Sequence, residues 1–112
     1  MKNLKYYGDK IYEFKDMPQQ LANTLVEMTK DYGELIDEQL PLERKKMDFF
    51  IEHKGLDKER PLSDKMLDAY WMKEGDGVLE KRMSMYKKGL EKMMSNLKAI
   101  LREKEQESRN QF

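Results

Sequence analysis

The sequence contains no cysteine and a single histidine, His53, among its 112 residues. Without cysteine the chain forms no disulfide and offers no thiolate as a nucleophile or metal ligand. One histidine is too few for a carboxylate–histidine di-iron bundle, which takes a Glu-x-x-His from each of two helices. A histidine beside Lys54 and Gly55 is typical of a helix C-terminus, where its charge interacts favourably with the helix dipole. We therefore predict no enzymatic activity, no metal site and no cofactor.

Long apolar runs are also missing. No segment approaches the roughly 20 apolar residues that span a membrane, and the N-terminal segment has no apolar signal-peptide core. The absence of cysteine fits a reducing compartment. We therefore expect a cytoplasmic protein without a membrane partner. Lysine outnumbers arginine, which is typical of an AT-rich bacterial or phage genome.

Charge and apolar content are instead high and balanced. Charged residues make up 39% of the chain and hydrophobic residues 38%, while the net charge is zero. A neutral chain is not a polycation that seeks nucleic acid as a whole. Solvated helices with apolar stripes have this composition, so we predict a mainly α fold and one domain over residues 1–112.

The clearest pattern lies in the last third of the chain. Apolar residues recur there at alternating steps of four and three, which predicts a helix of about eight turns with one apolar seam. Met94 and Leu101 widen this seam beyond what a two-stranded coiled coil prefers, and so favour a small helical bundle or helical hairpin. The predicted helix-packing seam consists of Leu79, Met83, Tyr86, Leu90, Met93, Leu97 and Ile100.

The first residues predict a different element. Aromatic residues on both sides of Gly8 and Asp9 resemble two short strands around a tight turn, in which Gly8 would take a positive φ. We therefore expect a short β-hairpin over 4–14.

Glycine and proline divide the rest of the chain. Pro41 predicts the end of a helix or a kink, and Gly75 to Gly77 predict a break, because the apolar stripe changes direction there. Met47, Phe50 and Ile51 form the expected packing face of the segment after Pro41. The expected elements are helices at 17–40, 42–54 and 64–74, a linker at 55–63, a long helix at 78–104 and a frayed tail at 105–112.

Carboxylates provide one enzymatic alternative. Glu34, Asp37 and Glu38 gather on one predicted helix, with Asp64 and Asp68 on another, and facing carboxylates bind magnesium. Solvated helix faces produce the same spacing, because charges at i and i+4 are neighbours there. We therefore predict that these residues are solvated.

A basic face is the second alternative. Lysine and arginine residues follow the side of the last helix that is opposite the seam, where a straight positive stripe fits phosphates. Base-reading Asn and Gln residues are scarce there, which favours non-specific binding. The possible nucleic-acid face consists of Lys81, Lys88, Lys92, Lys98 and Arg102.

The leading hypothesis is a non-enzymatic protein–protein interaction module of a bacterial or phage system. It would act as an assembly factor, adaptor or inhibitor through helix–helix packing. The expected partner is another copy of the chain, as a homo-oligomer, or a host or phage protein. A nucleic-acid-binding accessory protein is the alternative hypothesis.

Overall fold

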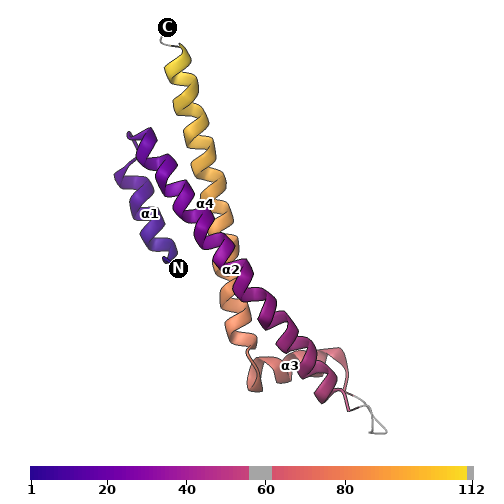
Figure 1. Ribbon diagram of the computed structural model, residues 1–112. Coiled ribbons are helices and arrows are strands. Elements are labelled where there is room, and N and C mark those ends of the chain that lie inside the picture. Colours follow the sequence, from indigo (N-terminus) through magenta and orange to yellow (C-terminus); the bar gives the residue numbers. More distant parts are fainter. Residues whose placement is uncertain (56–61, 111–112) are drawn as a thin grey trace. The chain divides into compact units, whose positions relative to one another are not determined.

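The computed structural model describes residues 1–55 and 62–110 of the chain. In that part it contains four helices: α1 (Leu4–Glu13), α2 (Pro18–His53), α3 (Asp64–Glu74) and α4 (Gly77–Asn110) (Figure 1). The mainly α prediction is confirmed. None of these helices contains a stretch long and apolar enough to span a membrane.

The predicted β-hairpin over 4–14 is wrong, because this segment forms α1. The side chain of Asn3 caps the helix by accepting a 2.8 Å hydrogen bond from the backbone N–H of Tyr6. Leu4, Tyr7 and Ile11 share one helix face, which alternates at steps of three and four rather than two. Gly8 is helical, and a Cβ at this position would lie 3.3 Å from Cε of Met93. Gly8 therefore allows α1 to approach α4 closely and forms no turn.

The helix end predicted at Pro41 is wrong, since α2 continues through it to His53 as one helix. Proline removes one intrahelical hydrogen bond and costs about 3 kcal/mol in a helix interior. Leu35 before it and Leu42 after it are both buried, so burial on either side offsets this cost. Local sequence preference is overridden here by tertiary contacts.

The break predicted at Gly75–Gly77 is present, because α3 ends at Glu74 and α4 begins at Gly77. α3 covers the range expected from the sequence, and the Ser63 side chain caps it. A Cβ on Gly77 would lie 2.6 Å from Cα of Met72, so only glycine fits this close approach. Most of the predicted linker (56–61) lies outside the described residues, and α4 continues to Asn110, beyond its predicted end.

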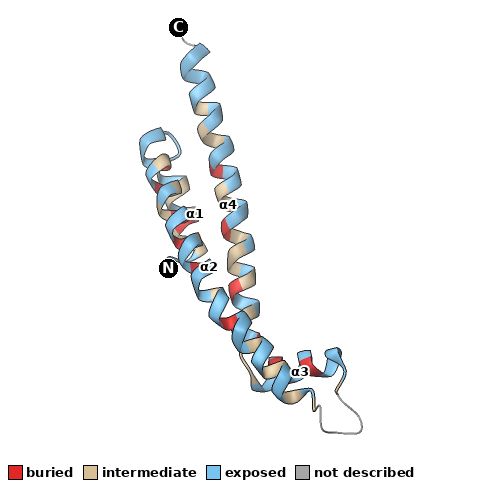
Figure 2. Cartoon of the chain, turned by 45° about the vertical axis from the view of Figure 1, so that its right-hand side comes forward, coloured by how far each residue is buried: buried red, intermediate tan, exposed pale blue. Residues whose placement is uncertain are grey.

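The chain, predicted as one domain, divides into two compact units. The first unit contains residues 1–35 and 85–112, and the second contains residues 36–84. In the first unit α1, the start of α2 and most of α4 enclose one apolar core (Figure 2). Its fully buried members are Tyr7, Leu21, Met28, Leu90 and Leu97.

The second unit has a smaller core around Trp71 of α3. The Trp71 ring meets the ring of Phe49 edge-on at 5.3 Å, and Phe49 in turn stacks on His53 at 3.9 Å. Lys46 of α2 forms a 3.0 Å ion pair with Glu80 of α4, and Lys45 pairs with Asp76. These contacts attach α3 and the first turns of α4 to the second half of α2.

Candidate interaction surfaces

The predicted seam of α4 is mostly an internal surface. Leu90 and Leu97 are fully buried in the core of the first unit. Tyr86, Met93 and Ile100 are half-buried against the same core. Residues of α1 and α2 therefore cover this part of the seam, and it needs no second chain.

The first two seam residues belong to the second unit. Met83 is nearly buried, whereas 50% of the surface of Leu79 is exposed. Leu79 and Met83 line a surface hollow of about 300 Å³ together with Pro41 and Leu42 of α2. Leu79, at this end, is the most exposed residue of the predicted seam.

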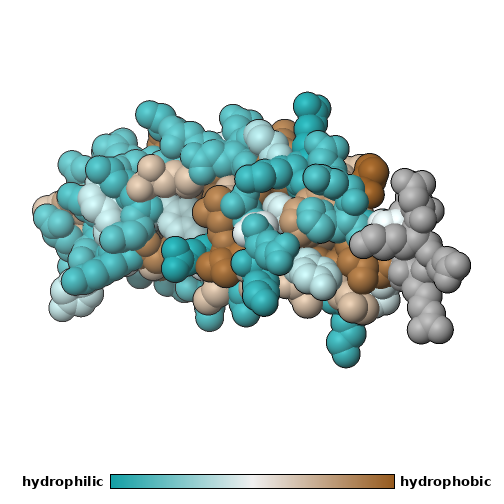
Figure 3. All heavy atoms as spheres, turned by 90° about the horizontal axis from the view of Figure 1, so that it is seen from below, coloured by the Kyte–Doolittle hydropathy of each residue, from teal (hydrophilic) through white to brown (hydrophobic). Residues whose placement is uncertain are grey.

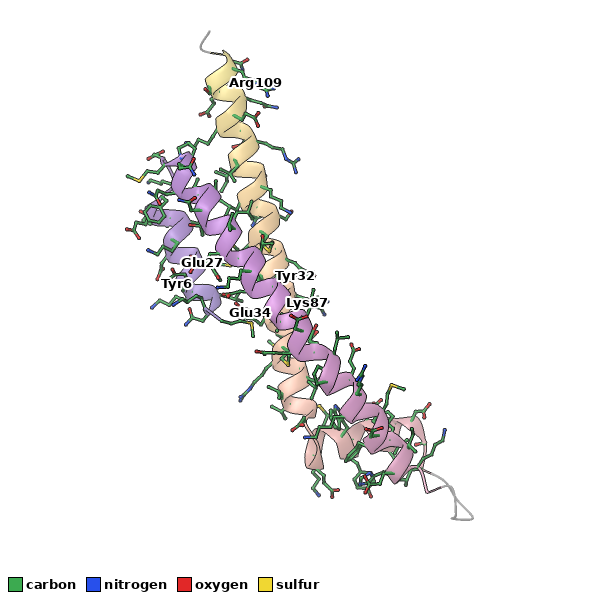
Figure 4. All side chains as sticks on the ribbon, viewed as in Figure 1. Tyr6, Glu27, Tyr32, Glu34, Lys87 and Arg109 are labelled. Carbon is green, nitrogen blue, oxygen red and sulfur yellow. The ribbon has the colours of Figure 1, made fainter. Side chains whose placement is uncertain are left out.

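A buried polar network attaches α1 to α2 in the first unit. Asp31 accepts a 2.8 Å hydrogen bond from the backbone N–H of Lys2 and another from the Tyr7 hydroxyl. Next to this pair, the Tyr6 hydroxyl donates to Glu27 at 3.0 Å (Figure 4). Hydrogen bonds to a buried carboxylate replace its lost hydration, so the network holds α1 in a defined orientation on α2.

The pKa values in this network follow from burial and hydrogen bonding. Burial raises the pKa of Tyr7 far above its ordinary value, and the hydrogen bond to Asp31 raises it further. Burial also acts to raise the pKa of Asp31, but the hydrogen bonds from Tyr7 and Lys2 and the nearby positive charge outweigh it. The pKa of Asp31 therefore lies below its ordinary value. Asp31 is an ionised structural carboxylate at neutral pH.

A second set of polar contacts joins α2 and α4 in the same unit. The Tyr32 hydroxyl donates a 2.8 Å hydrogen bond to Glu91, which raises the pKa of Tyr32. The ammonium group of Lys87 lies 5.9 Å from the centre of the Tyr32 ring, and Figure 4 shows the two residues side by side. Glu91 is the one acidic residue of the basic segment 81–102. Its carboxylate accepts the hydrogen bond from Tyr32.

The predicted nucleic-acid face lies on the solvent side of α4. All five of its residues are exposed. Within the described residues none of them has a carboxylate oxygen within 4.0 Å. Lys88, Lys92, Lys98 and Arg102 belong to the first unit and Lys81 to the second.

Sequence reasoning missed an exposed apolar surface on α2 in the second unit. Four large side chains there expose between 37% and 64% of their surface. At 100° per residue they fall within an arc of about 60°. We call this surface the α2 stripe; it consists of Ile36, Leu40, Met47 and Ile51. Apolar residues are also visible among hydrophilic ones at the surface in Figure 3.

Two of the four stripe residues were predicted to lie on a packing face, and the other two were not assigned to any face. Met47 and Ile51 were predicted to pack inward, whereas Phe49 contacts Trp71 and Leu42 is buried. The inward and outward faces of this segment are both apolar. The sequence does contain a sign of the stripe, which is the spacing of residues 36, 40, 47 and 51. These positions share one helix face only if α2 continues through Pro41.

Among the described residues, no three His, Cys, Asp or Glu side chains lie close enough together to hold a metal ion. Nδ1 of His53 lies 2.8 Å from the carbonyl oxygen of Phe49, at the end of α2. Its contacts are therefore those of a residue at a helix end.

Comparisons with protein families, with curated protein sequences and with solved structures find no match to this chain.

Proposed function

We propose that the chain is a protein–protein interaction module that works through helix–helix packing, as an assembly factor, adaptor or inhibitor. The observation that carries this proposal is the α2 stripe. Four exposed large apolar side chains in line on one helix leave apolar surface in water, and burying it against a second helix is favourable. The seam of α4 does not support the proposal, because the chain itself covers most of it.

A photoreactive side chain tests this proposal. Benzoylphenylalanine in place of Met47 is expected to crosslink to a protein chain in cells, and Leu40→Lys in the same chain is expected to abolish the product. Met85 provides the matched control position, since it is equally exposed (64%) but lies on α4 outside the stripe. Equal crosslinking from positions 47 and 85, or a product that is insensitive to Leu40→Lys, would contradict the proposal.

Nucleic-acid binding is the second candidate function, because the five cations of the predicted nucleic-acid face form no ion pair with any described residue. A surface of this kind binds phosphates by releasing counterions, so its affinity falls steeply with salt. Fluorescence anisotropy with labelled DNA and RNA at several salt concentrations tests it. Lys88→Glu with Lys92→Glu is expected to abolish binding, while Lys5→Glu with Lys30→Glu is the control of equal charge. No binding at low salt, or equal losses in both variants, would exclude this function.

A further inference from the structure

We infer that the α2 stripe binds the same stripe of a second copy of this chain, with the two α2 helices parallel. This inference rests on the proposed function and names its partner. Three observations support it: the alignment of the apolar side chains, the charges beside them, and the size of the surface.

The alignment is that of a short helix-pairing seam. The stripe extends over residues 36–51 of one continuous helix, which is about 22 Å along the helix axis at 1.5 Å per residue. Leu40 and Met47 are seven residues apart and lie near its middle, with Ile36 and Ile51 near its ends. A repeat of seven keeps apolar residues on the side that faces a partner helix. In a parallel two-fold pair each of these side chains meets its own copy.

The charges beside the stripe decide the orientation. Glu43 and Arg44 are both exposed, and each lies about 50° from the centre of the stripe, on opposite sides. Neither forms an ion pair with any described residue.

A two-fold axis parallel to the helices brings Glu43 next to the partner's Arg44, twice in each dimer. An antiparallel pair that aligns the stripe with itself brings Glu43 next to the partner's Glu43 and Arg44 next to the partner's Arg44. Like charges repel, so the parallel pair is favoured.

The size of the surface predicts the strength of association. Stable interfaces bury about 800 Å² on each partner, whereas this stripe presents four side chains on one helix. We therefore expect a weak dimer in equilibrium with the single chain. Its population rises with protein concentration.

Sedimentation equilibrium tests the association. The unmodified chain is expected to approach twice the mass of one chain as its concentration rises. Met47→Lys is expected to weaken the association at least tenfold. Glu43→Lys is expected to weaken it less, because it replaces an attraction to the partner's Arg44 with a repulsion at the rim of the stripe. Met85→Lys is the matched control and is expected to have no effect.

Single cysteines test the orientation, because the chain has no cysteine of its own. In the parallel pair, Leu40→Cys meets its own copy and forms a disulfide-linked dimer under mild oxidation. In the antiparallel pair, Leu40 lies opposite the partner's Met47 and about 10 Å along the axis from its own copy, beyond the roughly 7 Å that a disulfide bridges. There only a mixture of Leu40→Cys and Met47→Cys chains crosslinks efficiently.

Each outcome has a separate meaning. The inference is supported if Leu40→Cys chains crosslink efficiently to one another and if Met47→Lys weakens the dimer in sedimentation equilibrium. Crosslinking only in the mixture overturns the parallel orientation. A chain that remains single at all concentrations but crosslinks to a different protein from position 47 overturns the inference and leaves the proposed function intact. A single chain without any stripe-dependent crosslink overturns both.

Discussion

Both units leave some large apolar side chains in water, but they differ in how these side chains are arranged. In the second unit four of them line one side of α2, whereas those of the first unit are spread over α1, α2, α4 and the segments between them. Leu21 and Met28 in the first half of α2 are fully buried, but Leu40 and Met47 in its second half are mostly exposed. In the first unit α2 has two helical neighbours, α1 and α4, and a polar network that orients α1. The two halves of one helix therefore differ in exposure: both contribute to a core, but only the second half carries an exposed apolar stripe among the described residues.

A matched pair of substitutions tests this difference most strongly. Leu97→Asp places a charge in the core of the first unit, where an unpaired buried charge costs several kcal/mol, and is expected to abolish cooperative thermal unfolding. Leu40→Asp makes the same change on the exposed α2 stripe and is expected to shift stability by less than about 1 kcal/mol. Circular dichroism melting curves compare them. Similar losses in both variants would show that the stripe is part of a core.

Removal of one hydroxyl tests the polar network. Tyr7→Phe keeps the buried ring but takes a hydrogen bond from the buried carboxylate of Asp31, which is expected to cost about 1–3 kcal/mol in urea unfolding. Tyr6→Phe removes the hydrogen bond to the less buried Glu27 and is expected to cost less, about 0.5–1 kcal/mol. A larger loss for Tyr6→Phe would contradict the structural role assigned to Asp31.

The carboxylate of Asp31 is also expected to make a smaller, pH-dependent contribution to stability. The pKa of Asp31 is lower in the folded chain than in the unfolded chain, where it is about 3.9. Between these two values the unfolded chain binds more protons, so stability rises with pH and is lost as pH falls through the folded pKa. Urea unfolding between about pH 2 and pH 5 is expected to give a shallower slope for Asp31→Asn than for the unmodified chain. Equal slopes would show that Asp31 does not contribute to acid unfolding.

Two glycine substitutions are expected to have the smallest effects on stability. One glycine is packed against another helix and the other is not. Gly33 is exposed in the middle of α2, and a Cβ there would meet nothing within 4 Å. Gly33→Ala is expected to stabilise the chain by about 0.5–1 kcal/mol, since alanine favours the helix. A Cβ on Gly89 would lie 2.5 Å from Cδ1 of Leu4 in α1. Gly89→Ala is therefore expected to give no increase in stability, because the close contact offsets the helix preference of alanine. Equal thermal shifts in the two variants would contradict the close contact of α1 with α4.

The long helix α4, the range of α3 and the break at Gly75–Gly77 followed from local rules. Apolar spacing marked the seam, Ser63 capped α3, and the glycines coincided with a change in direction of the apolar stripe. These signals act over one or two helical turns, so the sequence carries them directly. Leu90 and Leu97 were accordingly recognised as members of a helix-packing seam.

Long-range contacts determined the remaining features. The segment 4–14 resembled a hairpin locally, but contacts of Gly8 and Leu4 with α4 make it a helix that closes a core. α2 continues through Pro41 because residues on both sides of it are buried. The second half of α2 is apolar on two faces, and spacing does not say which face another element covers. Burial depends on neighbours that are distant in sequence, so only the folded chain separates the inner face of α2 from the α2 stripe.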